Sequence, residues 1–162
     1  MNILRRTLIL VWLGAASSAS ASEITAFISK ATPDDVWAAG IGGAFSISFF
    51  SILHFEGEVA RQSGEFEGSK MYTLTGSVLV APPTGKVVPY AGLGVGAFRQ
   101  ETGARPDGAL NDNGTHSVLV AGLKVKLGAI FVVKGEYRRF GLSGKPLFAL
   151  ENRFSVGAGL SF

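Results

Sequence analysis

The C-terminal segment, Asn152–Phe162, reads N-R-F-S-V-G-A-G-L-S-F and gives the clearest indication of the fold. Apolar side chains alternate along it with residues that are polar or very small. Because successive side chains of a β-strand point to opposite faces, the segment predicts a strand with one apolar face and one small, polar face. The apolar face comprises Phe154, Val156, Ala158, Leu160 and Phe162.

Seven earlier segments contain similar apolar stretches separated by turn-forming residues, and most of them repeat with the same two-residue period. This period is typical of strands and not of helices. The sequence therefore predicts an all-β domain of eight strands. Their expected bounds are Glu23–Lys30, Val36–Ser48, Ile52–Gln62, Lys70–Ala81, Val87–Gln100, Thr115–Lys126, Ala129–Phe140 and Phe148–Phe162.

The segment Val36–Phe55 allows a second interpretation, because it carries no formal charge and is long enough to cross a bilayer as a helix. Gly40, Gly42 and Gly43 weaken a helix, although glycine is tolerated in membrane helices. The other segments already require a barrel, in which every strand edge is paired. A strand, a turn and a second strand are therefore favoured here.

The N-terminus has the pattern of a cleavable signal peptide over residues 1–21, which leaves a barrel domain over residues 22–162. Arg5 and Arg6 precede the apolar segment Leu8–Ala16, and Ala19-Ser20-Ala21 forms a cleavage site. Without these two arginines, 13 basic residues face 12 acidic ones, so the mature net charge is +1. This balance does not indicate a nucleic-acid partner. Cysteine is absent, and a closed barrel does not need disulfides to protect its edges.

Two internal segments and the C-terminal strand carry a family resemblance. The segment Pro89–Gly96, P-Y-A-G-L-G-V-G, resembles a strand that recurs in small bacterial outer-membrane β-barrels, and Glu136–Phe140, E-Y-R-R-F, resembles their near-terminal strand. The family includes OmpA transmembrane domains, OmpX-like proteins and related surface antigens. The resemblance implies an eight-stranded antiparallel up-and-down transmembrane β-barrel in the bacterial outer membrane. It also implies that the apolar face of the last strand, Phe162 included, is recognised by the barrel-assembly machinery.

The connections after the second, fourth and sixth predicted strands are short, whereas those after the third, fifth and seventh are longer and more polar. Outer-membrane barrels have short periplasmic turns and longer extracellular loops, so both termini are expected in the periplasm. Arg61, Lys70, Arg99 and Arg105 are then expected near the outer rim, where lipopolysaccharide phosphates could bind them. Outer-membrane lipids and lipopolysaccharide are thus the expected partners of a monomeric barrel.

Charged residues on the predicted inner faces sum to four acidic and four basic side chains. Near neutrality is expected of a salt-bridged plug in a narrow lumen, and a gated passive pore is the alternative. The predicted charge network comprises Glu56, Glu58, Lys124, Lys134, Glu136, Arg138, Glu151 and Arg153.

No catalytic, cofactor-binding or metal site is predicted. Barrel lipid A deacylases carry H-x-S in a late strand, whereas the comparable stretch here is Glu136-Tyr137-Arg138. A triad of Ser143, His116 and Asp112 at the rim lacks any accompanying motif. We therefore expect a non-enzymatic barrel with a structural or surface-interaction role. A porin-like pore, a lipid-modifying enzyme and a soluble barrel with inward apolar faces are the alternatives.

Overall fold

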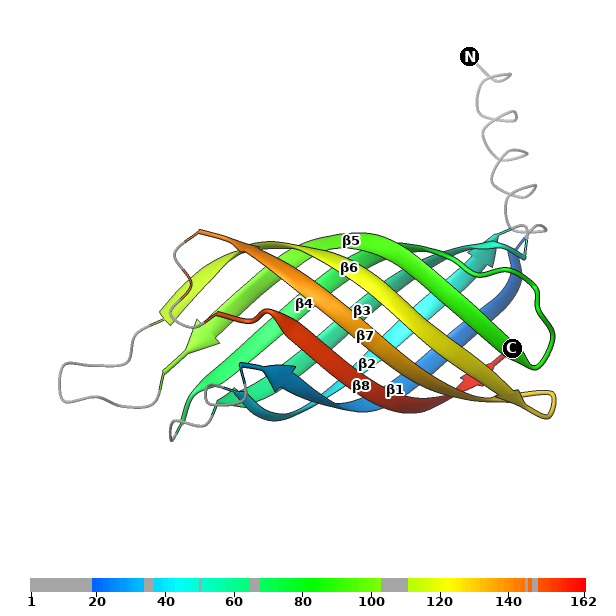
Figure 1. Ribbon diagram of the computed structural model, residues 1–162, viewed down its shortest axis with the longest axis horizontal. Coiled ribbons are helices and arrows are strands. Elements are labelled where there is room, and N and C mark those ends of the chain that lie inside the picture. Colours follow the sequence, from blue (N-terminus) through cyan, green and yellow to red (C-terminus); the bar gives the residue numbers. More distant parts are fainter. Residues whose placement is uncertain are drawn as a thin grey trace, which may run out of the picture.

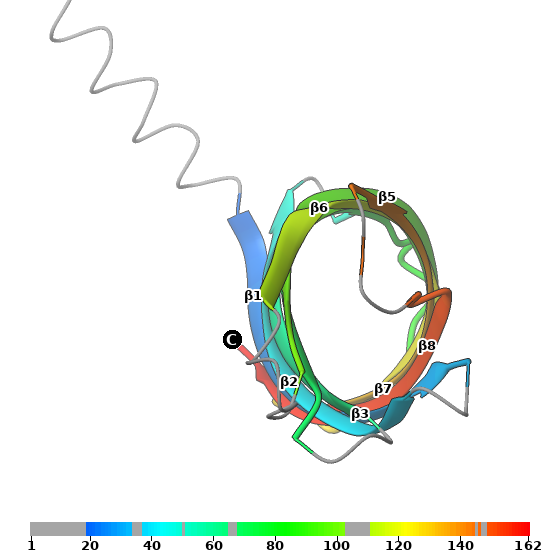
Figure 2. The ribbon, with the colours of Figure 1, turned by 90° about the vertical axis from the view of Figure 1, so that its left-hand side faces the viewer.

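The computed structural model describes residues 19–33, 37–49, 51–64, 68–102, 111–144, 146 and 149–162. Each strand pairs antiparallel with the next, and the last pairs with the first, so the sheet closes into an up-and-down barrel. Figure 1 shows the strands crossing the long axis obliquely, and Figure 2 shows the closed ring. The eight-stranded fold predicted from the sequence is confirmed. The strands are β1 (Ala19–Thr32), β2 (Trp37–Phe49), β3 (Leu53–Gly64), β4 (Lys70–Val80), β5 (Val87–Glu101), β6 (Asn111–Leu127), β7 (Phe131–Ser143) and β8 (Asn152–Ser161).

The uncharged segment that could have formed a helix folds as β2, a turn and the start of β3. Ser51 in this turn adopts a positive φ of 61°, which reverses the chain within a few residues. Among the described residues, none belongs to a helix with the length and hydropathy to cross a membrane.

Several strand ends differ from the predicted bounds. The polar segment Asn111–Gly114 was expected to be part of a loop but belongs to β6, because Glu101 to Phe98 of β5 supply its backbone partners. In the same way β7 continues to Ser143, which pairs with Thr115. β8 begins only at Asn152, so the strand predicted from Phe148 starts too early. At β6 and β7, composition predicted turns where pairing with a neighbour extends the strands.

The two ends of the barrel carry different connections. Residues 33–36, 65–69, 102–110 and 144–151 join strands at one end, which we call the long-loop end. Residues 50–52, 81–86 and 128–130 join strands at the other, the short-turn end, where β1 begins and the C-terminus lies (Figure 1). Ser22 and Phe162 exchange two backbone hydrogen bonds there, of 2.7 and 2.9 Å. Residues 1–18 of the predicted signal peptide lie outside the described residues, and its cleavage stays a prediction.

Glycines on the inner face give space to large side chains on the neighbouring strand. A Cβ atom on Gly122 would lie 2.5 Å from the ring of Tyr90, its direct partner in register. A Cβ atom on Gly96 would lie 2.7 Å from His116, again its direct partner. The rings of Tyr90 and His116 therefore occupy space that a Cβ atom on the adjacent strand would take.

Candidate functional site

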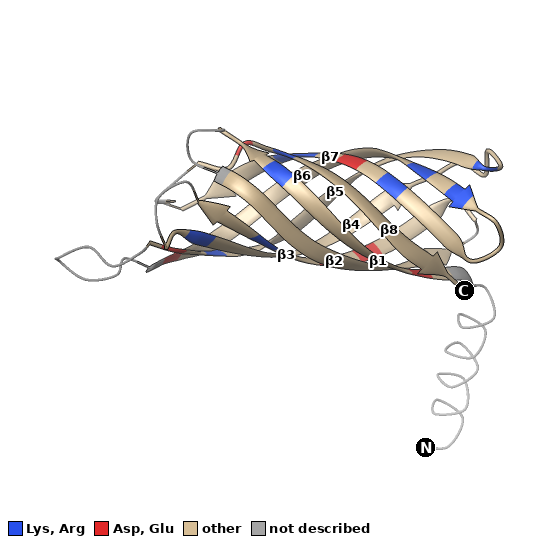
Figure 3. Cartoon of the chain, turned by 90° about the horizontal axis from the view of Figure 1, so that it is seen from below, with Lys and Arg blue, Asp and Glu red and all other residues tan. Residues whose placement is uncertain are grey.

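Acidic and basic side chains alternate through the lumen, beginning near the short-turn end. Lys124 of β6 donates to Glu23 of β1 at 2.9 Å, and Lys134 of β7 lies 3.4 Å from the same carboxylate. Lys134 also donates to Glu56 of β3 at 2.8 Å. Lys134 thus connects two carboxylates that come from different strands. Figure 3 marks the positions of the charged residues along the barrel.

The alternation continues around Arg138 of β7, whose side chain is 1% exposed. Its guanidinium group contacts Glu56 at 2.6 Å, Glu58 at 3.1 Å and Glu136 at 2.5 Å. Glu58 in turn accepts a hydrogen bond from Arg153 of β8. The Arg153 guanidinium carbon also lies 5.2 and 5.4 Å from the rings of Phe27 and Phe140, at distances typical of cation–π contacts.

The structure brings together seven of the eight residues predicted for the charge network and adds one. Glu151 does not belong to it, because β8 starts after this residue and its side chain is exposed. Glu23 takes its place. Sequence reasoning missed Glu23, although it shares the polar face of β1 with the buried Thr25 and Ser29. The charge network, as used below, comprises Glu23, Glu56, Glu58, Lys124, Lys134, Glu136, Arg138 and Arg153.

Formal charges in this network cancel, with four acidic and four basic groups. Two cavities of about 10 Å³ each adjoin it, and such a space holds about one water molecule. A wider vestibule of about 250 Å³ opens at the short-turn end and ends against Glu23, His54 and Lys124. Toward the long-loop end, Met71, Phe98 and other buried residues close the lumen. The network and this apolar layer together fill the barrel interior.

The three residues weighed as a catalytic triad are not assembled. His116 faces the lumen and forms a 2.9 Å hydrogen bond with Thr75 through Nε2. Ser143 is exposed and pairs in register with Thr115, the outward neighbour of His116. Asp112 Oδ1 accepts a hydrogen bond from the backbone of Asn113. The triad interpretation is therefore wrong, because the nucleophile and the base lie on opposite faces of the sheet.

Tyr90 points into the lumen, as do Glu136 and Arg138 of the segment compared with the deacylase motif. Tyr90 donates to Glu136 at 2.8 Å, and the same carboxylate accepts from Arg138. Lys134 lies 5.3 Å from the Tyr90 ring. Glu136 and Arg138 are thus engaged with each other and, across the lumen, with side chains of β5 and β3.

The outer face of the barrel is apolar along the strands. A soluble barrel would bury its apolar side chains inside. The outward orientation of the apolar side chains therefore excludes the alternative of a soluble barrel. An outward apolar belt around a closed barrel is what a strand-built membrane protein requires. The outward side chains include Ile28, Ile41, Val59, Leu74, Leu93, Val95, Phe131, Phe154 and Val156.

One polar row interrupts the outer face at the long-loop end. Tyr72 of β4 lies in register between Arg61 of β3 and Arg99 of β5, and all three side chains point outward. Arg99 Nε also lies 3.0 Å from a carboxylate oxygen of Glu101. We call Arg61, Tyr72 and Arg99 the rim row. Lys70, predicted for the same rim, is half-buried next to it, and Arg105 lies outside the described residues.

These features define a small transmembrane β-barrel with a filled, ion-paired lumen. Comparisons with solved structures place the chain in the fold of the eight-stranded outer-membrane barrels, as the OmpA- and OmpX-like resemblance predicted. No family model and no curated protein matches the sequence.

Three similar structures illustrate the likeness. The N-terminal β-barrel domain of Pseudomonas aeruginosa OprF is 18% identical, with a TM-score of 0.65 over 89% of this chain and 98% of that one. Ail, the attachment invasion locus protein of Yersinia pestis, is 17% identical, with a TM-score of 0.64 over 88% and 98%. Neisserial surface protein A is 15% identical, with a TM-score of 0.62 over 87% and 94%. At these identities the likeness concerns the fold.

Proposed function

We propose that the protein is an integral barrel of the bacterial outer membrane with a structural or surface-interaction role and no catalytic activity. The observation that carries this proposal is the filled lumen, in which eight charges neutralise one another and leave water-sized cavities. Such an interior suits a scaffold that holds its loops at a membrane surface. The likeness to outer-membrane barrels supports the compartment.

In the proposed orientation the long-loop end faces the medium, and both termini face the periplasm. The two longest connections, residues 102–110 and 144–151, join strands at the long-loop end. They support this orientation, because outer-membrane barrels have short periplasmic turns and longer extracellular loops. The rim row then lies at the level of lipopolysaccharide phosphates, with which guanidinium groups form strong paired hydrogen bonds. Lipopolysaccharide and the surrounding lipids are therefore the proposed partners, and the assembly machinery is the proposed partner during insertion.

Labelling of single cysteines tests the orientation, since the chain has no cysteine of its own. Ser143→Cys places a thiol at an exposed site of the long-loop end, and Pro83→Cys places one in an exposed turn at the other end. A membrane-impermeant maleimide added to intact cells should label Ser143→Cys only, and lysed cells should label both. Labelling of Pro83→Cys alone in intact cells would reverse the proposed orientation.

A narrow passive pore is the second candidate, and the vestibule that reaches Lys124 and Glu23 is the observation that favours it. Conduction would require the ion pairs around Arg138 to exchange partners, since they close the lumen at its centre. We expect no steady conductance of the parent protein in planar bilayers. Steady openings that disappear on Lys134→Met would favour the pore.

A further inference from the structure

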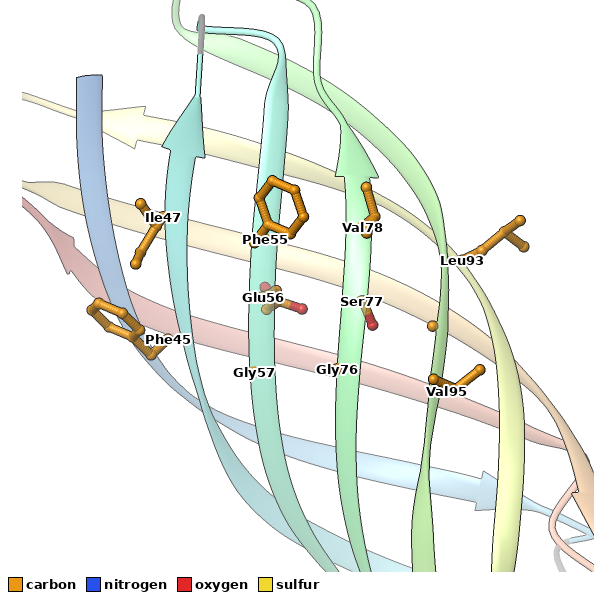
Figure 4. Close-up of a pocket in the computed structure, with 11 residues that line it drawn as sticks. Phe45, Ile47, Phe55, Glu56, Gly57, Gly76, Ser77, Val78, Leu93 and Val95 are labelled. Carbon is orange, nitrogen blue, oxygen red and sulfur yellow. The ribbon is translucent and has the colours of Figure 1, made fainter. Parts of the chain in front are cut away.

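A groove of about 550 Å³ runs over the outward face of β2 to β5. Its floor consists of Gly57 of β3 and Gly76 of β4, which lie side by side in register. Figure 4 shows labelled apolar side chains on either side of these two glycines and above them in the view, while Glu56 and Ser77 point to the other face. We call this feature the glycine groove. Its apolar walls are formed by Phe45, Ile47, Phe55, Val78, Leu93 and Val95.

The two glycines are not required by the packing of the barrel itself. A Cβ atom on Gly57 would meet no heavy atom within 4 Å, and on Gly76 the nearest atom would be 4.0 Å away. The inner-face Gly122, by contrast, has Tyr90 at 2.5 Å. The space above the paired glycines therefore lies on the outer face, and the described residues leave it unfilled.

Polar and apolar features of this face are aligned along the same strands. Gly57 and Gly76 form one pair of the register. Val59 and Leu74 form the next lipid-facing pair toward the long-loop end, and the rim row follows after them. Arg61 lies four positions after Gly57, a distance of about 13 Å along the strand. At the usual tilt of a membrane strand, this is about 10 Å along the bilayer normal. One leaflet of the hydrocarbon core is about 15 Å thick, so a single lipid spans both features.

We propose that the glycine groove holds an acyl chain of lipid A in the extracellular leaflet, and that Arg61 and Arg99 bind a phosphate of the same molecule. This inference rests on the orientation given in the proposed function. The positive charge of the rim row complements the lipid phosphates, and the groove is lined by hydrocarbon side chains at the depth of the acyl chains. Lipid A is chosen over a glycerophospholipid because it forms the extracellular leaflet in this orientation.

A second copy of the barrel fits this face less well. Two copies related by a two-fold axis along the bilayer normal would bring their glycine grooves together and their rim rows to the same level. Arg61 and Arg99 of both copies would then face one another across the interface. Like charges at close range oppose such a pairing, whereas a phosphate between the guanidinium groups is favourable.

Titration of the folded protein in detergent micelles, followed by native mass spectrometry, tests the inference. Bisphosphorylated lipid A should bind with a stoichiometry of one, and fully dephosphorylated lipid A and phosphatidylglycerol should bind more weakly. The double variant Arg61→Gln/Arg99→Gln should lose at least about tenfold in affinity, as expected when charged hydrogen bonds to phosphate are removed. Heat-modifiable gel migration confirms that each variant is folded.

A second variant fills the groove. Gly57→Leu/Gly76→Leu should weaken lipid A binding by about tenfold, the loss expected when about two buried methylene groups are displaced. Gly135→Leu is the matched control, because Gly135 is an outward glycine of β7 whose Cβ would also meet open space. This control should bind lipid A like the parent. If the double leucine variant does not fold, Gly57→Val alone replaces it.

Each of the following results would contradict one part of the proposal. If the arginine variant loses binding and the filled groove does not, the groove is unoccupied, and only the rim contact of the proposed function stands. If phosphatidylglycerol binds as tightly as lipid A, the assignment to lipid A is wrong. Dimers that disappear on filling the groove would identify a second copy as the occupant. Binding that no variant changes refutes both the groove and the rim contact, while cysteine labelling decides the orientation separately.

Discussion

Replacement of Glu56 by glutamine tests whether the charge network holds the barrel together. Glu56 accepts hydrogen bonds from Lys134 at 2.8 Å and from Arg138 at 2.6 Å, and its side chain is 1% exposed. Glutamine keeps the shape and one accepting oxygen but removes the negative charge. The network is then left with four positive and three negative groups, and Lys134 and Arg138 next to the substituted residue are buried.

The expected cost follows from the contacts that remain. Breaking a buried ion pair costs about 3–5 kcal/mol when one charge is left without a partner. Here Lys134 keeps its 3.4 Å contact with Glu23, and Arg138 keeps Glu58 and Glu136. We therefore expect the free energy of unfolding to fall by about 3 kcal/mol, at the lower end of that range.

Urea unfolding of the protein in lipid vesicles, followed by Trp37 fluorescence and gel migration, measures this change. The matched control is Glu101→Gln, whose ion pair with Arg99 is largely exposed (59% and 32%) and should contribute less than about 1 kcal/mol. A second variant, Glu56→Gln/Lys134→Met, restores neutrality and should recover part of the loss. If Glu56→Gln is no less stable than Glu101→Gln, the network does not stabilise the fold.

Three further predictions concern a second carboxylate of the charge network, an inner-face glycine and the C-terminal residue. The charge reversal Glu136→Lys should lower thermal stability in detergent micelles by more than the neutral Glu136→Gln, and a variant as heat-resistant as the parent contradicts the buried network. Gly122→Ala should cost about 1–3 kcal/mol in urea unfolding, because its Cβ would overlap Tyr90, whereas Gly57→Ala should be nearly neutral. Phe162→Ser should reduce the amount of folded barrel in cell envelopes but not refolding from urea in vitro; equal loss in both assays would refute a role in recognition by the assembly machinery.

Strand alternation was sufficient to predict which residues face the lumen, because a period of two follows from the backbone alone. The prediction holds for Glu56, Lys134 and Arg138, which lie well inside their strands. It fails for Glu151, because the alternation begins only where β8 begins, at Asn152, and composition did not reveal that boundary.

Which charges meet depends on register and closure, which a single sequence does not specify. Lys134 of β7 joins Glu23 of β1 to Glu56 of β3, and these strands meet only across the lumen. The glycine groove was likewise not predictable, because Gly57 and Gly76 become neighbours only through the register of β3 and β4. The sequence predicts whether a side chain faces the lumen or the outside. The position of that side chain along the barrel axis depends on the register of all eight strands.

The seam between β1 and β8 imposes an order on how this barrel is made. Its ten residue pairs, from Glu23–Ser161 to Thr32–Asn152, join the first strand of the chain to the last. Until β8 has been delivered, the growing sheet has two open edges, and unpaired backbone groups are costly in hydrocarbon. The ring therefore cannot close progressively during export. It needs a temporary partner for both edges or a single concerted insertion step, so the last strand controls when the protein becomes a membrane protein.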